Sequence, residues 1–491
     1  MKQSLLWLTG GRRELPASLA ADLNLHKLLP ERTITLLSRL CTTDEIAARQ
    51  DIFRRLEDTD FLTAVHTFAD SLTRFSQASD AWNAAKNDVK RSELEEIFLL
   101  RRLCEAQIGV SRCGQALAQQ NGESPFLEAL YQRMEALSEE NALIRRALAD
   151  SQSAEETLST LSMRMEGGGV FICRTMNPDS LTAKIEAYAE AMELPCKKKS
   201  SREIRILPAL SEALAKLYSA EFASLRQCSL DCTPHIDRSL TDLRGEIEFY
   251  LSITDLISRG RKQGFAVCYP SIVGEKRFSA RDAYDFTLLV KNCAVVANDI
   301  DFDADAPVCF LTGANGGGKT TYLRCAAANL LLALCGCPVF AAEMCCYPFD
   351  YICTHFPADE SFTGSGRLVE EAARVDSLLQ SCTADSFIFF NETYSGTDDI
   401  KGARMTLETA SRVRESGAYS LWVTHFHEVA DGDFVMLTTV MDETDTANRT
   451  FRIRRAKGGG SSYAADILRK YKLDAASLRQ REEDEYAKPA L

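Results

Sequence analysis

Apolar residues follow two different patterns along the chain, and the first of them is helical. From about residue 15 to residue 260, apolar positions recur every three or four residues, which predicts helices nearly throughout. Thr42 and Glu45 have the spacing of a capping box ahead of an amphipathic stretch at residues 46–62. A heptad seam with one polar position predicts two helices packed within a bundle, with an intermolecular coiled coil as the alternative. The seam runs through Leu130, Met134, Leu137, Asn141, Ile144 and Leu148.

A short insertion interrupts the helical region. Glycines at residues 167–169 end the helical pattern, a β-like segment follows at residues 170–173, and residues 203–206 are a candidate partner strand. Helix resumes over about residues 210–258. For this insertion at about residues 166–206, contact with a DNA backbone and a solvated loop without a partner are both open. The candidate DNA contacts are Lys197, Lys198, Lys199 and Arg202.

The second pattern begins after residue 269, where short continuous apolar runs alternate with helical stretches. Such runs are typical of buried, mostly parallel strands, and they lie at residues 308–311, 387–390, 421–423 and 435–440. We therefore expect an all-α domain over residues 1–268. An α/β domain over residues 269–475 and a charged tail over residues 476–491 are expected to follow it.

Composition limits the classes of protein that this chain can represent. With 491 residues, 45% hydrophobic and 26% charged, it has the balance of a multidomain globular protein. Lys and Arg total 57 against 70 Asp and Glu, and the net charge of -13 argues against a strongly basic nucleic-acid coat. The 17 cysteines form no CxxC pair, which argues against a zinc ribbon or a thioredoxin-type site and favours reduced thiols. Because the most apolar run, at residues 330–342, is too short to span a membrane, we expect a cytoplasmic protein.

The strongest chemical motif lies between the apolar run at residues 308–311 and a helical stretch. It fits the P-loop pattern GxxxxGK followed by Ser or Thr, in which backbone N–H groups turn toward phosphate oxygens at a helix N-terminus. Lys319 is expected to reach the β- and γ-phosphates of ATP, and the Thr320 hydroxyl to ligate Mg2+. A plain glycine-rich turn is the alternative. The expected nucleotide contacts in the motif are Gly313, Asn315, Gly316, Gly317, Gly318, Lys319, Thr320 and Thr321.

A second motif begins about seventy residues further on, where the apolar run at residues 387–390 is followed by Asn391 and Glu392. This is the arrangement of a Walker-B segment, whose first polar residue holds Mg2+ and whose second polarises the attacking water. Asn391 brings an amide where an Asp is usual, so we expect weak metal binding. Glu392 keeps the general-base role, with a solvent-facing residue at a strand end as the alternative.

Two further segments complete the candidate site. His425 follows the apolar run at residues 421–423, and it either senses the γ-phosphate or caps the strand by bonding to its backbone. Ser365, Gly366 and Arg367 lie in a small-residue loop ahead of a helix. Such a loop either presents N–H groups and an arginine to a nucleotide held by another subunit or is a turn with a surface arginine.

In their order along the chain and in their residues, these motifs resemble the ATPase domain of the MutS family of DNA mismatch-repair proteins. The resemblance covers most of residues 240–470. GANGGGKTT at residues 313–321 is close to the family's GPNMGGKST, and residues 424–428 are similar to its Thr-His-Tyr-Phe-Glu run. The resemblance implies an α/β P-loop ATPase domain of the ABC type, preceded by helical core and lever segments, with ATP and Mg2+ as cofactors. It also implies that Val295 and Val296 pack on adenine, that Asn298 belongs to the same segment, and that two subunits share each site.

The chain also departs from the family pattern. Only about thirty residues precede the part that resembles the core, so we expect neither a mismatch-reading nor a connector domain. Asn391 and Leu368 replace an Asp and a Ser of the family, and both argue against fast hydrolysis. We expect a homodimeric MutS-like ATPase whose helical levers bind branched or duplex DNA through its backbone in repair or recombination. The alternative is a nucleotide-dependent dimerisation switch that acts on protein partners with little or no hydrolysis or DNA binding.

Overall fold

The structure is a computed structural model. The chain folds into two compact units. The helical unit comprises Met1–Leu5 and Thr59–Ile247, and the α/β unit comprises Leu6–Asp58 and Glu248–Leu491. The α/β unit therefore takes segments from both sides of the helical unit, and the linear boundary after residue 268 stays a prediction. The described residues are 4–8, 13–88, 91–119, 124–166, 169–174, 208–291, 293–357, 367–441 and 449–456. Outside them lie Lys197, Lys198, Lys199, Arg202, Ser365, Gly366 and the tail at residues 476–491.

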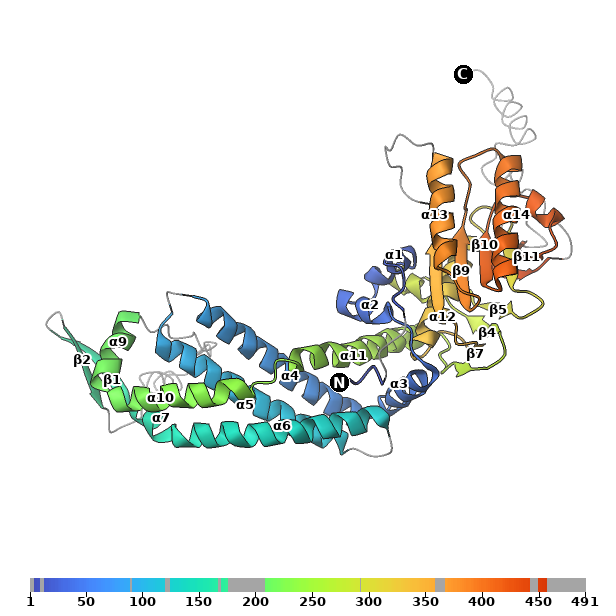
Figure 1. Cartoon of the computed structure of the whole chain (residues 1–491). Helices are drawn as coiled ribbons and strands as arrows, with labels where there is room; N and C mark the ends of the chain where they lie inside the picture. The colour runs from blue at the N-terminus through green and yellow to red at the C-terminus, as the bar shows by residue number, and fades with distance from the viewer. Residues whose placement is uncertain are drawn as a thin grey trace, which may run out of the picture. The chain divides into compact units, whose positions relative to one another are not determined.

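Long helices make up the helical unit (Figure 1). The helix α5 packs between α4 and α6, and α10 packs against α5, α6 and α7. Gly114 on α5 lets Met134 of α6 approach closely, because a Cβ at Gly114 would collide with the Met134 side chain. The helices are α4 (Thr59–Lys86), α5 (Glu93–Ala118), α6 (Pro125–Asp150), α7 (Gln152–Ser159), α9 (Pro208–Leu217) and α10 (Ser219–Cys232).

The heptad seam lies on α6 and faces into the bundle. Its members Leu130, Met134, Leu137 and Ile144 are buried. The polar member, Asn141, is fully buried too, and its Oδ1 accepts a hydrogen bond from Gln107 Nε2 on α5 at 3.0 Å. Within the described residues the seam thus serves packing between helices of one chain.

The insertion begins as a β-hairpin rather than as the end of a helix. Strand β1 (Leu161–Glu166) pairs antiparallel with β2 (Gly169–Arg174). The β-like segment at residues 170–173 was therefore predicted correctly, and among the described residues it pairs with the segment before the glycines. Strands that are adjacent in sequence can pair without a long connection. Residues 203–206, the candidate partner, lie outside the described residues.

The first segment of the α/β unit is helical: α1 (Ser18–Asp22), α2 (Glu31–Leu37) and α3 (Thr43–Arg55). The predicted capping box is present, with Thr42 and Glu45 exchanging both hydrogen bonds. The amphipathic stretch at residues 46–62 is two helices, because the chain tightens into i to i+3 hydrogen bonds at Glu57 and Asp58 before α4 begins. The helix α11 (Leu240–Lys262) runs from one unit into the other.

Buried Arg49 ties this first segment to the rest of the α/β unit. Its guanidinium donates to the carbonyl oxygen of Leu6 at 2.9 Å and to that of Cys335 at 2.9 Å. It also lies over the rings of Trp7 and Phe249, at 4.4 and 5.2 Å from their centroids. Carbonyl oxygens and aromatic faces together replace the water that this cation loses on burial.

A six-stranded sheet is the centre of the α/β unit, in the order β12-β11-β6-β10-β9-β8. Strands β11, β6, β10, β9 and β8 are parallel, and β12 pairs antiparallel with β11. All four apolar runs predicted as strands lie in this sheet. The strands are β6 (Val308–Thr312), β8 (Tyr351–His355), β9 (Ser386–Asn391), β10 (Tyr419–Val423), β11 (Val435–Met441) and β12 (Arg449–Arg455).

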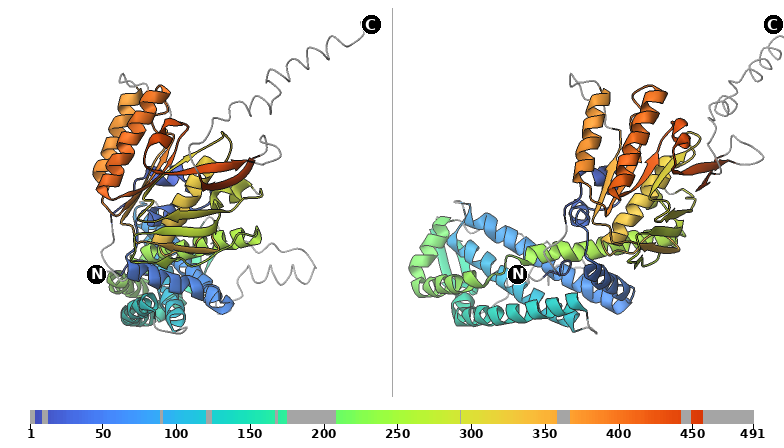
Figure 2. Two further views of the ribbon diagram at one scale, coloured as in Figure 1. Left: turned by 90° about the vertical axis from the view of Figure 1, so that its right-hand side faces the viewer. Right: turned by 45° about the vertical axis from the view of Figure 1, so that its right-hand side comes forward.

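A second, four-stranded sheet of mixed direction has the order β3-β7-β4-β5. Helix α12 (Lys319–Leu334) packs against strands of both sheets. Helices α13 (Arg367–Ser381) and α14 (Asp399–Ser416) lie side by side (Figure 2), and α14 packs against β6 and β10 of the six-stranded sheet. Phe278 and Phe302 of the smaller sheet meet Phe387 of the larger one edge to face, at 5.7 and 5.1 Å between ring centroids. The smaller strands are β3 (Ser271–Ile272), β4 (Phe278–Ala283), β5 (Asn298–Phe302) and β7 (Glu343–Cys346).

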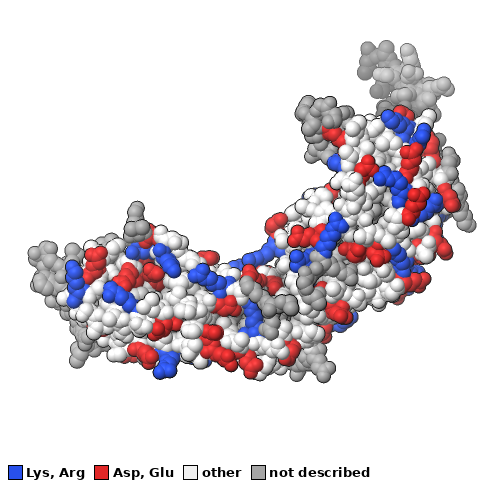
Figure 3. All heavy atoms as spheres, in the orientation of Figure 1, with Lys and Arg blue, Asp and Glu red and all other residues white. Residues whose placement is uncertain are grey.

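The surface carries charges of both signs. On the face in Figure 3, Lys and Arg side chains alternate with Asp and Glu, and no large area is uniformly basic. None of the described helices has the length and apolar character that a membrane span requires.

Candidate nucleotide-binding site

The predicted motifs meet at one edge of the six-stranded sheet. Strands β6, β10 and β9 are parallel neighbours, with Val423 in register with both Leu311 and Asn391. Their carboxyl ends therefore lie side by side, which is where open α/β sheets bind ligands. The P-loop motif follows β6, Asn391 ends β9 and His425 comes two residues after β10.

The loop between β6 and α12 needs its glycines. Gly313, Gly316 and Gly318 have φ angles of 124°, 72° and 92°, which favour glycine. A Cβ at Gly313 would collide with Thr439 of β11, and one at Gly317 would lie 2.9 Å from the carbonyl oxygen of Ala314. No side chain caps the N-terminus of α12, so its first N–H groups point toward the loop without a cap.

Lys319 lies inside the loop that precedes it. Its side chain is 6% exposed, and Nζ donates to the Gly313 carbonyl oxygen at 2.8 Å and to Asn315 Oδ1 at 3.3 Å. Burial lowers the pKa of Lys319, and the nearby carboxylate of Glu392 opposes that shift by favouring the ammonium. The first and second motifs are thus close enough to interact electrostatically.

Thr320 and Asn391 form the direct contact between the two motifs. The Thr320 hydroxyl donates to Asn391 Oδ1 at 3.1 Å, and Asn391 is 7% exposed. Hydroxyl and amide oxygens are ligands that suit Mg2+, so the pair fits this ion by ligand type. Both oxygens are neutral, however, so the pair supplies none of the negative charge that an Asp would contribute.

Glu392 begins a turn with unusual backbone geometry. Glu392 and Tyr394 both have positive φ, 50° and 65°, which costs a residue with a side chain about 1–2 kcal/mol. The Glu392 N–H donates to the Val423 carbonyl oxygen at 2.8 Å, and the Tyr394 hydroxyl lies 3.2 Å from Thr409 Oγ1. Strained backbone of this kind clusters at functional sites.

His425 is partly exposed and faces helix α14. Its side chain is 39% exposed, and Nε2 lies 3.8 Å from Asp399 Oδ1. The cap at the end of β10 is made by Thr424, whose Oγ1 accepts the Phe426 N–H at 3.1 Å. His425 therefore lies at the same sheet edge as the other two motifs, and its role as a phosphate sensor stays a prediction.

Comparison with known proteins agrees with this geometry. Residues 309–455 match the family model described as MutS domain V. The DNA mismatch repair protein MutS of Caldanaerobacter subterraneus subsp. tengcongensis is 35% identical over 136 residues, covering 27% of this chain and 16% of the relative. This part of the chain is therefore similar to domain V of MutS proteins. The protein of the same name from Chlorobium phaeobacteroides is 26% identical over 277 residues, 54% of this chain and 32% of the relative.

The shared part is therefore limited. The matches to MutS of the Caldanaerobacter strain and of Listeria welshimeri each cover 16% of the relative's length, so this chain spans a small part of those proteins. The matched family model covers β6 to β12 and thus all three motifs of the site.

The segment expected to meet the base in a MutS-type site lies beside β12. Val295 and Val296 are half-buried just before β5. The Asn298 amide joins β5 to β12, because its Nδ2 donates to the Phe451 carbonyl oxygen at 2.9 Å and its Oδ1 accepts the Ile453 N–H at 2.8 Å. The amide is thus engaged in holding β12, and contact of these three residues with a nucleotide stays a prediction.

Three residues near the P-loop were not predicted from the sequence. Buried Thr439 packs on Gly313 and Gly317, and its hydroxyl has no hydrogen-bond partner among the described residues. Phe451, 48% exposed, lies beside Gly318, and the charge of Arg449 acts on Lys319. All three come from the β11–β12 hairpin, which carries no motif in sequence.

Most of the loop predicted to reach a neighbouring subunit lies outside the described residues. Ser365 and Gly366 lie outside the described residues, as do all four candidate DNA contacts. Arg367 is the first residue of α13, and its side chain is not among those described.

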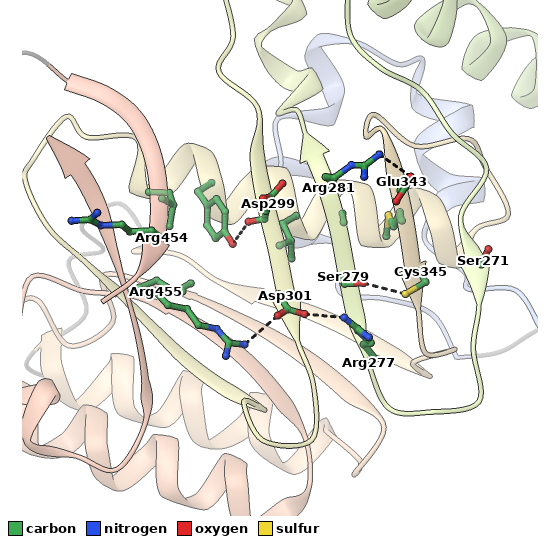
Figure 4. A pocket seen from close by; sticks show the side chains of 16 residues that line it. Ser271, Arg277, Ser279, Arg281, Asp299, Asp301, Glu343, Cys345, Arg454 and Arg455 are labelled. Atoms are coloured by element: carbon green, nitrogen blue, oxygen red, sulfur yellow. Dashed lines mark hydrogen bonds and ion pairs between the residues drawn. The ribbon is translucent and has the colours of Figure 1, made fainter. Parts of the chain in front are cut away.

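A separate cavity of about 780 Å³ opens on the outer face of the four-stranded sheet (Figure 4). Its charged side chains are mostly paired with one another, since Asp301 accepts from Arg277 at 3.4 Å and from Arg455 at 3.3 Å. Arg281 and Glu343 form another ion pair at 2.7 Å. None of the P-loop residues lines this cavity, so it is not the candidate nucleotide site.

Proposed function

We propose that this chain is a MutS-type P-loop ATPase that binds ATP and hydrolyses it slowly. The observation that carries the proposal is the contact between the two motifs: Thr320 donates to Asn391, and Lys319 lies within electrostatic reach of Glu392. Those are the groups that phosphoryl transfer requires around a triphosphate. The fold proposed for the α/β unit is accordingly the ABC-type ATPase fold, in agreement with the similarity to domain V of MutS proteins.

The residues of the loop are proposed to hold the nucleotide. The N–H groups of residues 315–321 and the Lys319 ammonium would bind the phosphate oxygens, and Val295 and Val296 would pack on adenine. Thr320 and Asn391 would hold Mg2+, which neutralises charge on the phosphates when it is bound. Because Asn391 is neutral, metal binding is expected to be weaker than with a carboxylate.

Glu392 and His425 are proposed to act on the reacting groups. Glu392 would orient the attacking water and accept its proton, which requires the carboxylate to face the loop, as its interaction with Lys319 supports. His425 would donate a hydrogen bond toward the γ-phosphate from the end of β10. Lys319 would stabilise charge on the transferred group.

Nucleotide binding is proposed to act on a dimer and on DNA. The loop of Ser365, Gly366 and Arg367 would complete the site of a second subunit, and helical levers would transmit the nucleotide state to DNA bound by its backbone. Phosphate contacts would come from Lys197, Lys198, Lys199 and Arg202. Similarity to domain V of MutS proteins supports this role in repair or recombination.

The nucleotide part is tested by ATP affinity. Lys319→Ala should weaken ATP binding by at least about tenfold, whereas Lys276→Ala, which removes a lysine bonded to the carbonyl oxygens of Ala384 and Gly417, should not. Equal affinity of wild type and Lys319→Ala would end the proposal. The DNA part is tested by titrating duplex and junction DNA at increasing salt, because binding through phosphate contacts must weaken steeply.

One observation favours a second function, a nucleotide-dependent dimerisation switch. The Thr320–Asn391 pair presents no charge to a metal ion, which suits binding without turnover. ATP-driven dimerisation with no phosphate release and no DNA binding would establish this alternative. Phosphate release that depends on Glu392 would exclude it.

A further inference from the structure

His355 lies at the end of β8, beside the strand that carries the candidate general base. It is in register with Phe390 of β9, and its side chain is 5% exposed. Its Nδ1 lies 3.0 Å from the hydroxyl of Thr393, which is itself 2% exposed. His355 thus contacts the residue that directly follows Glu392.

Thr393 is the middle residue of the strained turn. Glu392 and Tyr394, on either side of it, both have positive φ. Such a turn persists only where surrounding contacts fix it. The backbone of Glu392 is held by Val423 and the side chain of Tyr394 by Thr409. Among the described residues, His355 contacts the side chain of Thr393 between them.

The strand end that carries His355 is itself braced by α1. The hydroxyl of Thr354 donates to Asp22 Oδ2 at 2.6 Å, and Arg324 Nε of α12 donates to the Asp22 carbonyl oxygen at 2.8 Å. Three elements therefore converge on this point: α1, β8 and the helix that begins with Lys319. A movement of His355 would have to break these contacts or bend β8.

We propose that His355 is a positioning residue, which holds Thr393 so that Glu392 keeps its carboxylate toward the P-loop. The inference deepens the proposed function and rests on Glu392 acting in hydrolysis. Burial, together with the nearby Arg374 charge, lowers the pKa of His355 to about 4, so the ring is neutral at pH 7. Its Nε2 is buried without a hydrogen-bond partner among the described residues, so the contact with Thr393 is made by Nδ1 alone.

Paired substitutions test the contact. An Asn amide ends near the position of Nδ1 and a Gln amide near that of Nε2, so His355→Asn should keep turnover and His355→Gln should lose it. Thr393→Ser should likewise keep turnover, and Thr393→Val should lose it. The expected loss in kcat is about 10- to 100-fold, as for a misplaced catalytic group, with ATP affinity unchanged. Thr406→Val, which removes another buried hydroxyl, one that donates to the Gly402 carbonyl oxygen, is the matched control.

A double variant and a structural measurement decide the outcome. His355→Gln with Thr393→Val should be no worse than either single change, because both remove one contact. Hydrogen–deuterium exchange of residues 391–397 should speed up in His355→Gln and Thr393→Val but not in Thr406→Val. Three outcomes would overturn the inference. They are a loss of kcat in the double variant that equals the product of the two single losses, a parallel loss of ATP affinity, and unchanged hydrogen–deuterium exchange in His355→Gln and Thr393→Val. If the wild type binds ATP without turnover, hydrolysis in the proposed function fails, and exchange still decides whether His355 holds the turn.

Discussion

At the scale of single residues, the neutral side chain of Asn391 distinguishes the candidate site from an ordinary P-loop ATPase site. Asn391 accepts a hydrogen bond from Thr320 where a carboxylate would also bring charge to Mg2+. The Asn391 side chain is nearly buried, so the local electrostatic field depends strongly on this choice.

Asn391→Asp should therefore strengthen Mg2+ binding and raise ATP turnover, each by about tenfold, since charge-assisted contacts are roughly twice as strong as neutral ones. The measurement is phosphate release as a function of Mg2+ concentration. Asn391→Ala serves as the opposite control and should weaken Mg2+ binding. An unchanged half-saturating Mg2+ concentration in Asn391→Asp would contradict the assignment of Asn391 to the metal.

A second prediction concerns His355 and the loss of folding stability at acidic pH. The pKa of His355 is about 4 in the folded chain against the ordinary 6.5, so only the unfolded state gains a proton as pH falls from 6.5 to 4. Stability should therefore be lost over this window, by up to about 3 kcal/mol, and should not change through His355 above it. Urea unfolding at several pH values measures the slope. His355→Asn should show a shallower slope than wild type, and equal slopes would refute the prediction.

At the scale of elements, continuous apolar runs located four strands of the larger sheet, β6, β9, β10 and β11, but neither β8 nor β12. Strands β6, β8, β9 and β10 have no exposed position at all. The four-stranded sheet was harder to predict, because strands such as β5 alternate buried and exposed residues and β3 has only two residues. The capping box of α3 was predictable since its two partners are three residues apart.

The contacts that shape the site were not predictable, because they join distant residues without a motif. Thr393 and His355 are 38 positions apart, Asn298 and Phe451 153, and Asp22 and Thr354 332. The P-loop was predictable because phosphate binding fixes residue types within one short segment. Thr439 packs on that segment, but the residues around Thr439 form no motif that would predict the contact.

The loop geometry makes a prediction at this scale. Gly313→Ala should lower the free energy of unfolding by about 1–3 kcal/mol and abolish ATP binding, because its φ of 124° excludes a side chain and its Cβ would meet Thr439. Gly274→Ala is the control, since no atom lies within 4 Å of a Cβ there. Thermal unfolding and ATP titration are the measurements. Equal stability of the two variants would mean that the loop adopts another conformation.

At the scale of the whole molecule, the proposal is that two subunits share each nucleotide site. Lys319 of one chain and Arg367 of the other would then serve the same nucleotide. Symmetry makes this arrangement testable without any structure of the dimer, because a heterodimer of two different defective chains keeps one intact site.

Lys319→Ala and Arg367→Ala should each be nearly inactive in ATP hydrolysis when alone. An equal mixture should regain about one quarter of wild-type activity, since half of the dimers are mixed and each has one of two sites intact. Phosphate release before and after mixing is the measurement. A mixture as inactive as its components would show that Arg367 acts on the nucleotide of its own chain or on none.

The interrupted sequence of the α/β unit has a consequence for synthesis of the protein. Leu6–Asp58 leaves the ribosome first, but its partners in Glu248–Leu491 follow only after the helical unit, roughly 10–40 s later at ordinary elongation rates. During that time Arg49 lacks the carbonyl oxygen of Cys335, and Asp22 lacks Thr354. The contacts that fix Arg49 and Asp22 in the folded α/β unit therefore form only after the helical unit has been synthesised.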